Sequence, residues 1–514
     1  MSVIKTLNKT TSGRIKLFFK GTRSINRPSL YEHLNTCSIE SVVDTFVTAF
    51  YFRDCRGGKG ERDLGRSVMK WLFLQYPDNF MKIVHLIPEY GRWDDIMSLW
   101  PGVFHLQYPK SGNKDSWLLY INNNFDVNIK THNELVKIQS YQLEIVRLMG
   151  NQLNIDMKLA KEGKPISMCC KWAPTEKDSM DRKFHTVLTL CKEMKWTCKQ
   201  YRKQYTSQLR IYAKIVEGLM CKKQWDTIDF NKVSSHAMRR LKAAFLKNTR
   251  NTFIAWSVGL TAKVNDSQFM PHEIIKEIRA KGYADRVLEE QWRCLERGSK
   301  HLNDSIAVVD TSSSMTTKQS PIDVALGLGL LIANTSQGPF HNQIITFSNS
   351  PTYITIPDSS IFERYDILRE SGWAGSTNLQ ATFDLILDRA QKFKITTNYM
   401  PKRIFILTDM CFNSADGYGI DERVLQGEKT NLKIIDVKYK NAGYTRPNII
   451  FWDVRGDGND FTVSTNKSGS TLISGFSPTI MSAILNGDTL DCWDIVNKIL
   501  HSGRYDPIYN CLRA

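Results

Sequence analysis

The chain of 514 residues lacks the features of secreted and membrane proteins. No apolar run approaches the ~20 residues that cross a bilayer, and residues 1–21 are polar and basic, unlike a signal peptide. The 11 cysteines are odd in number and irregularly spaced, and none form a C-x-x-C pair. We therefore expect reduced thiols, an intracellular and cytoplasmic location, and no membrane span.

A complete phosphate-binding loop is also missing. Residues 53–62 are rich in glycine, but they do not satisfy G-x-x-x-x-G-K-[S/T]. They also follow a predicted helix, whereas that motif follows a strand. We expect a structural turn here, and a phosphate docked on the start of the next helix is the less favoured alternative.

Charge divides the chain. Residues 301–514 carry 19 Lys and Arg against 22 Asp and Glu, a net −3, so the total of +17 leaves +20 for residues 1–300. A chain of this length exceeds one hydrophobic core, and the sign change predicts a boundary at residues 298–300. We predict a basic N-terminal arm over 1–34, an all-α domain over 35–300 and an α/β domain over 301–514.

The basic part predicts helices in series. In residues 38–55, Val43, Phe46 and Phe50 recur at helical spacing, and Ser38 is the expected N-cap. Short breaks between successive helices predict a HEAT-like α-solenoid. The further helices are expected over residues 61–76, 78–87, 93–100, 134–161, 181–195, 202–221, 235–247, 271–280 and 284–297.

The last part alternates short apolar runs with longer amphipathic ones. Such alternation predicts a doubly wound, Rossmann-like α/β fold with a parallel sheet. Residues 451–460, rich in Gly and Asp, are expected to form a loop near one sheet edge. Strands are expected over 305–309, 343–347, 353–356, 403–408 and 432–437, and helices over 322–334 and 379–393.

Oxygen-bearing side chains follow the ends of these strands. Asp310 ends the first strand, and Ser312 and Ser314 can share its side because alternate residues of an extended segment point the same way. Thr377 precedes a helix in a glycine-containing loop, and Asp409 ends another strand. Carboxyl ends of parallel strands meet at one sheet edge. An oxygen-only set of this kind suits Mg²⁺, with Mn²⁺ or Ca²⁺ as alternatives, and leaves room for an acidic group of a protein partner.

These five residues match the D-x-S-x-S, Thr, Asp set of the metal-ion-dependent adhesion site. The surrounding order of strands and helices resembles the von Willebrand factor A (vWA) domain. The resemblance implies direct metal contacts for Asp310, Ser312, Ser314 and Thr377, and a direct or water-mediated contact for Asp409. The alternative for D-x-S-x-S alone is a solvated, Ser-rich turn.

Residues 191–250 form the most basic segment, with 15 Lys and Arg against 4 Asp and Glu. Aromatic residues such as Trp196 and Tyr205 are interleaved, and such a surface can neutralise phosphates and stack bases. The alternatives are helices with basic polar faces and buried aromatics, or an acidic protein partner. The residues that we predict to bind nucleic acid are Lys195, Lys199, Arg202, Lys203, Arg210, Arg239, Arg240 and Lys242.

The chain resembles one family across nearly its whole length. Residues 53–62, 87–95, 171–174 and 201–210, together with the vWA motif, look like a family of unknown function found in plants and giant viruses. Its architecture is similar to that of the Ro autoantigen of the TROVE class, a ring of HEAT-like helices with a vWA domain that binds small noncoding RNAs. The resemblance implies a TROVE-like helical domain and a ribonucleoprotein, by analogy of architecture.

These observations predict a non-enzymatic scaffold that binds nucleic acid, RNA above all, and docks an acidic partner through a divalent metal. One alternative is a virion structural or genome-associated protein. Another is a metal-dependent phosphoester hydrolase. Against the hydrolase, a D-x-D phosphatase arrangement is absent from the sequence and Ser312 has no evident His base.

Overall fold

A computed structural model describes most of the chain, in two compact units. Residues 12–262 and 500–514 form the helical unit, and residues 263–499 form the α/β unit, so the second is inserted in the sequence of the first. No helix of the described residues is long and apolar enough to cross a membrane. The described residues are 12–21, 25–100, 131–233, 235–258, 270–299, 302, 304–310, 315, 321–347, 350–371, 379–408, 434–454, 464–466, 470–474 and 492–513.

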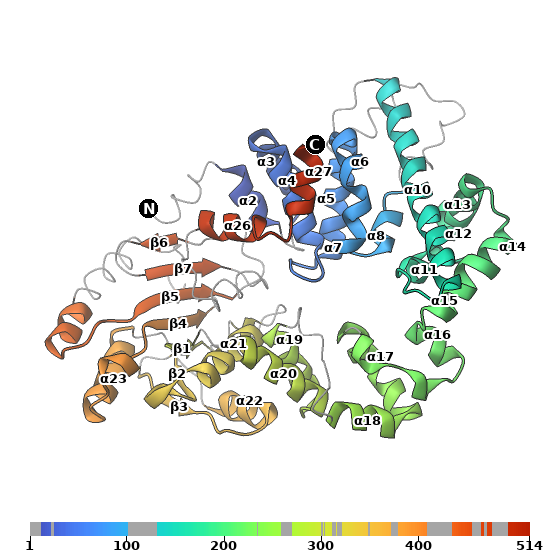
Figure 1. Ribbon diagram of the computed structural model, residues 1–514. Coiled ribbons are helices and arrows are strands. Elements are labelled where there is room, and N and C mark those ends of the chain that lie inside the picture. Colours follow the sequence, from blue (N-terminus) through green and yellow to red (C-terminus); the bar gives the residue numbers. More distant parts are fainter. Residues whose placement is uncertain are drawn as a thin grey trace. The chain divides into compact units, whose positions relative to one another are not determined.

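The helical unit consists of helices of very unequal length (Figure 1). The predicted all-α class is confirmed for this unit, whereas a HEAT-like repeat stays a prediction. Its main helices are α2 (Gly13–Lys20), α3 (Arg27–Glu40), α4 (Val42–Arg53), α5 (Arg62–Gln75), α6 (Pro77–Ile83), α7 (Ile87–Tyr90), α8 (Trp93–Met97), α10 (His132–Lys161), α11 (Cys169–Trp172), α12 (Ser179–Phe184), α13 (Thr186–Met194), α14 (Cys198–Gln200), the π-helix η2 (Tyr201–Gln208), α15 (Leu209–Tyr212), α16 (Val216–Cys221), α17 (Ser235–Asn248), α18 (Arg250–Val258) and α27 (Asp506–Arg513).

The first helices differ from the prediction at their ends. The hydroxyl of Ser41, rather than Ser38, caps α4 by accepting a hydrogen bond from the backbone of Asp44 at 3.1 Å. Glu40 accepts hydrogen bonds from the backbone N–H groups of Gly13 and Arg14, so it caps α2. Residues 13–20 and 27–34, which were predicted as part of an arm, therefore lie in packed helices.

The C-terminal segment belongs to the helical unit, where α27 packs on α4 and α6 (Figure 1). Asp54 is fully buried and accepts hydrogen bonds from the Arg504 guanidinium, one of 2.7 Å, and from the Tyr505 hydroxyl at 3.1 Å. Tyr509 donates to Asp44 at 2.8 Å. The last residues, predicted within the α/β domain, thus complete the first helices.

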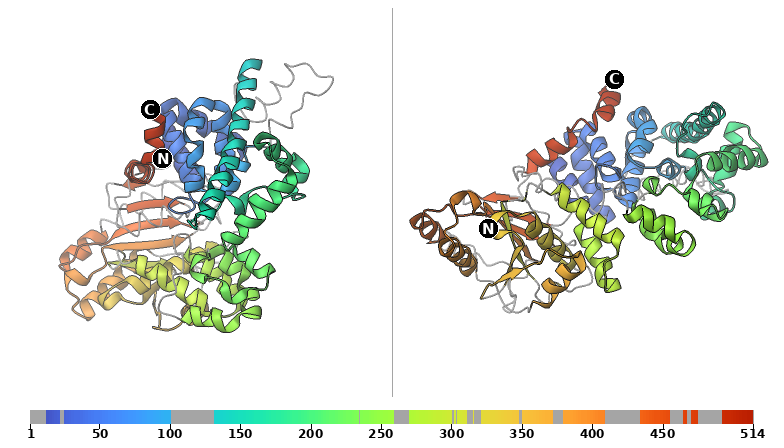
Figure 2. Two further views of the ribbon diagram at one scale, coloured as in Figure 1. Left: turned by 45° about the vertical axis from the view of Figure 1, so that its right-hand side comes forward. Right: turned by 60° about the horizontal axis from the view of Figure 1, so that its bottom comes forward.

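The α/β unit is built on a seven-stranded sheet of order β3-β2-β1-β4-β5-β7-β6 (Figure 1; Figure 2, left). β3 and β6 pair antiparallel with their neighbours and all other pairs are parallel, which confirms the predicted α/β class. The strands are β1 (Ser305–Val309), β2 (Gln343–Thr346), β3 (Tyr353–Thr355), β4 (Arg403–Thr408), β5 (Asn448–Asp453), β6 (Ser464–Asn466) and β7 (Ser470–Ser474).

Helices cover both faces of this sheet. On one face α21 (Pro321–Thr335) approaches closely, because a Cβ at Gly329 would lie 2.5 Å from Val309 of β1. On the other face Ile306 and Val308 belong to a core with Phe383 and Ile386 of α23 (Leu379–Lys392). The apolar runs of β1 and β4 are fully buried for this reason.

Two helices that we expected in the helical domain pack on the α/β unit instead. They are α19 (Pro271–Lys281) and α20 (Arg286–Gly298). Arg279 of α19 pairs with the buried Asp323 of α21 at 2.8 Å. Glu296 of α20 pairs at 2.9 Å with Arg364 of α22 (Ile361–Glu370).

Two expectations for this unit were wrong. Residues 434–441 are helical where a strand over 432–437 was predicted, and β5 occupies the start of the predicted 451–460 loop. Ile435 and Tyr439, four residues apart, are both buried in the core, so burial at helical spacing prevails over β-branched composition.

Candidate functional site

The structure places Asp310 at the carboxyl end of β1, directly beside the end of β4. Val309 pairs with Leu407, and the Asp310 backbone N–H donates to the Leu407 carbonyl at 2.9 Å. The Asp310 side chain is only 3% exposed and accepts a 2.6 Å hydrogen bond from the hydroxyl of Thr408, the last residue of β4. This pair of neighbouring strand ends therefore holds one carboxylate in a fixed, nearly dry position.

This position is the topological switch point of the sheet. From β1 the chain proceeds to β2 and β3 on one side, and it returns on the other side with β4 and β5. Loops at such a point diverge above the sheet and leave room for a ligand at the carboxyl edge. The buried carboxylate of Asp310 suits a hard cation there.

The other four predicted metal ligands, Ser312, Ser314, Thr377 and Asp409, lie outside the described residues. Asp409 follows Thr408, the residue that contacts Asp310, directly in the sequence. Among the described residues no three His, Cys, Asp or Glu side chains gather in a way that could hold a metal ion. The predicted set relies mainly on hydroxyl oxygens, and its convergence stays a prediction.

Thr408 is a site residue that the sequence analysis missed. It is 1% exposed and contacts Asp310 across the parallel pair of β1 and β4. A hydroxyl residue just before a strand-terminal carboxylate is the signal that could have found it. That Thr408 contacts Asp310 depends on β4 lying next to β1, and the D-x-S-x-S motif alone does not give this strand order.

The predicted nucleic-acid residues fall into two groups. Lys195, Lys199, Arg202 and Lys203 are exposed and occupy a short stretch from the end of α13 to η2. Lys195 has a left-handed backbone with φ of 56°, where α13 ends and the chain turns. This stretch provides a dense group of cations on the surface of the helical unit.

The remaining residues are partly engaged within the protein. Arg210 donates to the backbone carbonyls of Cys170 at 2.8 Å and Ala173 at 3.1 Å, so it holds the loop after α11 in place. Arg240 pairs with Glu217 at 3.3 Å, and Arg202 of the first group also has a partner, Glu176 at 3.0 Å. Lys242 is partly buried in α17, and the side chain of Arg239 lies outside the described residues.

The aromatic residues of this segment pack mainly on one another. The Trp196 ring stacks on the Tyr205 ring, with centroids 3.9 Å apart. It also stacks on the Tyr201 ring, with centroids 6.1 Å apart. Tyr201 is 1% exposed and donates to the Pro174 carbonyl at 2.7 Å. For Tyr201 the structure favours the interpretation as a core residue over that of a base-stacking platform.

The glycine-rich loop after α4 is a structural turn, as expected. Lys59 is half-buried, and its ammonium donates to the carbonyls of Phe18 at 2.5 Å and Gly21 at 2.8 Å. These carbonyls end α2, so Lys59 caps a helix C-terminus instead of facing a phosphate. Its Nζ also lies 4.8 Å from the ring centroid of Phe52.

Comparisons with known proteins agree with a family of unknown function. Residues 129–305 match the family model described as a domain of unknown function, DUF2828, and residues 304–501 match another, DUF7788. An uncharacterized protein of Acanthamoeba polyphaga mimivirus is 28% identical over 536 aligned residues, which cover 98% of this chain and 87% of that protein. These matches support the predicted likeness to a family of unknown function with a giant-virus member.

One of the solved structures that match aligns with most of this chain. The crystal structure of the Deinococcus radiodurans Ro (RSR) protein has a TM-score of 0.33 and 13% identity, covering 93% of this chain and 87% of that one. The two family matches meet at residues 304–305, close to the predicted boundary at 298–300, whereas the compact units divide at residue 263.

Proposed function

We propose that the protein is a non-enzymatic scaffold with two binding parts. The α/β unit is a vWA domain that binds a divalent cation, Mg²⁺ in the first place, and through it an acidic group of a protein partner. The helical unit binds nucleic acid, with RNA as the expected class.

The observation that carries the proposal is the Asp310 carboxylate at the switch point, fixed by Thr408 (2.6 Å) where β1 and β4 end side by side. A fixed carboxylate at this edge offers a negatively charged oxygen ligand, which is the kind that a hard cation prefers. Ser312, Ser314, Thr377 and Asp409 would complete the oxygen set. Neutral hydroxyl ligands would leave the ion positive enough to attract an acidic side chain.

The basic stretch supports the second half of the proposal. Lys195, Lys199 and Lys203 are exposed on the helical unit, within a segment of 15 cationic and 4 anionic residues. Phosphate neutralisation by such cations releases counterions and gives affinity that falls with salt. RNA is the proposed nucleic acid by analogy with the Ro class, which the expected order of a helical part and a vWA domain resembles.

Isothermal titration with Mg²⁺ and Mn²⁺ tests the metal site. We expect binding heat from the wild type and none from Asp310→Ala. The matched control is Asp304→Asn, because Asp304 lies before the opposite end of β1, where it pairs with Arg403. Equal cation binding by wild type and Asp310→Ala would refute the metal site.

Gel shifts at two salt concentrations test the nucleic-acid half. Structured RNA, single-stranded RNA and duplex DNA are compared for the wild type and for the double variant Lys199→Ala/Lys203→Ala. We expect weaker binding and a salt slope reduced by about 1.5, because two phosphate contacts are lost. Lys392→Ala/Lys394→Ala, two exposed lysines of the α/β unit, is the control. If no nucleic acid shifts, an acidic protein partner becomes the better explanation of the charge.

The mimivirus relative favours one second candidate, a virion structural or genome-associated protein. Such a protein would use the same cations against a packaged genome. Mass spectrometry of purified particles distinguishes the two roles, since a scaffold of infected or host cells would be absent from them.

A further inference from the structure

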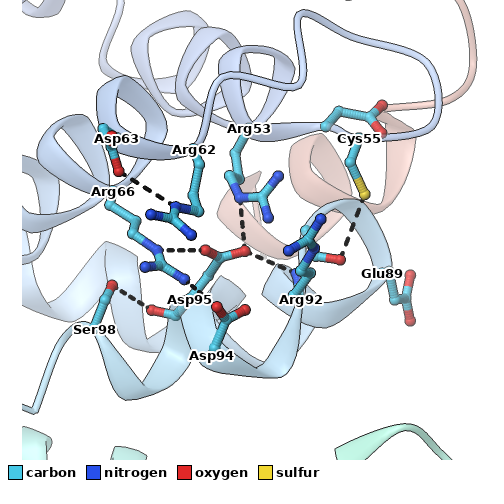
Figure 3. A network of polar contacts seen from close by, with 12 residues as sticks. Arg53, Cys55, Arg62, Asp63, Arg66, Glu89, Arg92, Asp94, Asp95 and Ser98 are labelled. Carbon is cyan, nitrogen blue, oxygen red and sulfur yellow. Dashed lines mark hydrogen bonds and ion pairs between the residues drawn. The ribbon is translucent and has the colours of Figure 1, made fainter. Parts of the chain in front are cut away.

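The helical unit contains a polar cluster that the proposed function does not use. Three parts of the chain meet in it: the end of α4, the start of α5 and the loop before α8 (Figure 3). We call it the Asp95 cluster and define it by Arg53, Arg62, Arg66, Arg92, Asp94 and Asp95.

Asp95 is the centre of the cluster and is 3% exposed. Its carboxylate accepts hydrogen bonds from Nε of Arg53 and Nε of Arg66, each at 2.7 Å, and from the backbone N–H of Arg92 at 2.8 Å. Arg66 also reaches Asp94 at 2.6 Å. One carboxylate thus accepts hydrogen bonds from two guanidinium groups and from the backbone at the start of α8.

Donors exceed acceptors in this cluster. Arg53 is 2% exposed, yet its Nη2 has no hydrogen-bond partner within the described part of the chain. Among the residues that the structure describes, Arg62 pairs only with Asp63, at 3.4 Å, and that carboxylate is 89% exposed. A buried guanidinium with an unpaired donor is costly unless a ligand or a water completes it.

Arg53 and Arg92 are held in place before any ligand arrives. Arg53 passes between two glycines, because a Cβ at Gly65 would lie 2.8 Å from its Cβ and one at Gly91 would lie 3.2 Å from its Cγ. The guanidinium of Arg92 lies over the Trp172 ring, 4.9 Å from its centroid. Figure 3 shows Arg53, Arg62 and Arg92, which come from different elements, around Asp95.

We propose that Arg53, Arg62 and Arg92 form a binding site for a phosphate group. A planar guanidinium offers parallel N–H donors that match phosphate oxygens, and a stacked guanidinium loses little freedom on binding. A cation is disfavoured because the unpaired groups of these three residues are donors. Asp94 accepts from Arg66 through Oδ2, and its Oδ1 is a buried oxygen without a partner among the described residues, so one acceptor faces the several free guanidinium N–H groups. The site depends on neither the metal site nor the lysines from α13 to η2.

Isothermal titration of the full-length protein with inorganic phosphate tests this site. We expect saturable binding by the wild type and an affinity weaker by about 10-fold in Arg62→Ala and in Arg92→Lys, because Lys replaces the planar fork with a point charge. Arg62 is 56% exposed, so Arg62→Ala should fold, and thermal melting checks both variants. The matched control is Arg369→Ala, since Arg369 is 53% exposed and pairs with Asp366 in the α/β unit.

Two oligonucleotides identify the source of the phosphate. Displacement of inorganic phosphate by a 5′-phosphorylated dinucleotide, but not by its 5′-hydroxyl form, assigns the site to a strand terminus; failure of both assigns it to free phosphate. Absence of phosphate heat from the folded wild type overturns the proposal and leaves a structural network completed by water. Equal affinity in wild type and both cluster variants overturns it as well, as does an equal loss in Arg369→Ala.

Discussion

The lysine of the glycine-rich loop is a structural residue whose charge depends on pH. Burial lowers the pKa of Lys59 to about 7, while its ordinary value of about 10.4 applies in the unfolded chain. Between these values the unfolded chain binds more protons than the folded one, so the free energy of unfolding rises as pH increases from about 7 to about 10. The carbonyls of Phe18 and Gly21 favour the ammonium form and limit this rise.

We predict that Lys59→Met removes this pH dependence. The difference in unfolding free energy between wild type and variant should change by at most about 1.4 kcal/mol per pH unit in that range. Urea unfolding at pH 7, 8 and 9 measures it. Lys82→Met, an exposed lysine of α6, is the control and should follow the wild type. Parallel pH profiles for wild type and Lys59→Met would contradict the prediction.

Thr408 should tune the metal site without being a ligand. Its hydroxyl donates to Asp310 at 2.6 Å in a buried position, so Thr408→Val keeps the shape and removes the donor. We expect Mg²⁺ affinity to fall on the order of 10-fold, as for other residues that orient a metal-binding carboxylate, with a stability loss of about 1–3 kcal/mol. Thr408→Ser keeps the hydroxyl and should bind like the wild type in the same titration. Identical affinities for Val and Ser variants would refute this role.

At the scale of elements, the pairing of α27 with the first helices depends on Asp54. This carboxylate is fully buried, and Arg504, whose side chain is 35% exposed, supplies its only ion pair among the described residues. Tyr90 stacks on Tyr505 at 5.5 Å and donates to the Arg504 carbonyl at 2.7 Å. The glycine-rich loop, through Asp54, therefore holds the C-terminal segment in place.

We predict that Arg504→Ala destabilises the helical unit by about 3 kcal/mol, because a buried charge loses its partner. Arg513→Ala, at the end of α27 where the guanidinium lies over the Tyr509 ring, is the control and should cost less than about 1 kcal/mol. Thermal unfolding followed by circular dichroism compares the two. A smaller loss for Arg504→Ala than for Arg513→Ala would contradict the prediction.

The spacing of apolar residues predicted helices and strands well where one face of the element is buried. It predicted them poorly where the conformation depends on contacts with residues distant in the sequence. The helices around Phe46, Val68 and Leu153 followed from apolar spacing, and β1 and β4 from apolar runs ending in carboxylates. The helix holding Ile435 and the strand holding Trp452 did not follow, because the core selects their conformation. The position of Asp310 at the end of a strand was predicted from the local sequence. The ion pair of Asp54 with Arg504 could not be predicted, because the two residues are 450 positions apart.

For the whole molecule, the insertion of the α/β unit makes the helical unit depend on the end of the chain. Residues 500–513 return after the inserted unit to bury Ile508, Tyr509 and Leu512. Burial of each such side chain contributes roughly 1.5–3 kcal/mol to the free energy of unfolding. Removing the segment also removes Arg504, the ion-pair partner of Asp54. The sum of these contributions approaches the 5–15 kcal/mol that a domain typically has in total.

We therefore predict that a chain ending at residue 499 has a helical unit that is unfolded or melts far earlier, while the α/β unit persists. Scanning calorimetry should show the loss of one transition and the retention of the other. Mg²⁺ titration of the truncated chain should still give binding heat, because Asp310 and Thr408 both lie in the α/β unit. Adding a peptide of residues 500–514 in excess should raise the weakened transition, since it binds only the folded helical unit. Unchanged calorimetry after truncation would show that the C-terminal helix is dispensable, and loss of the Mg²⁺ heat would show that the two units do not fold independently.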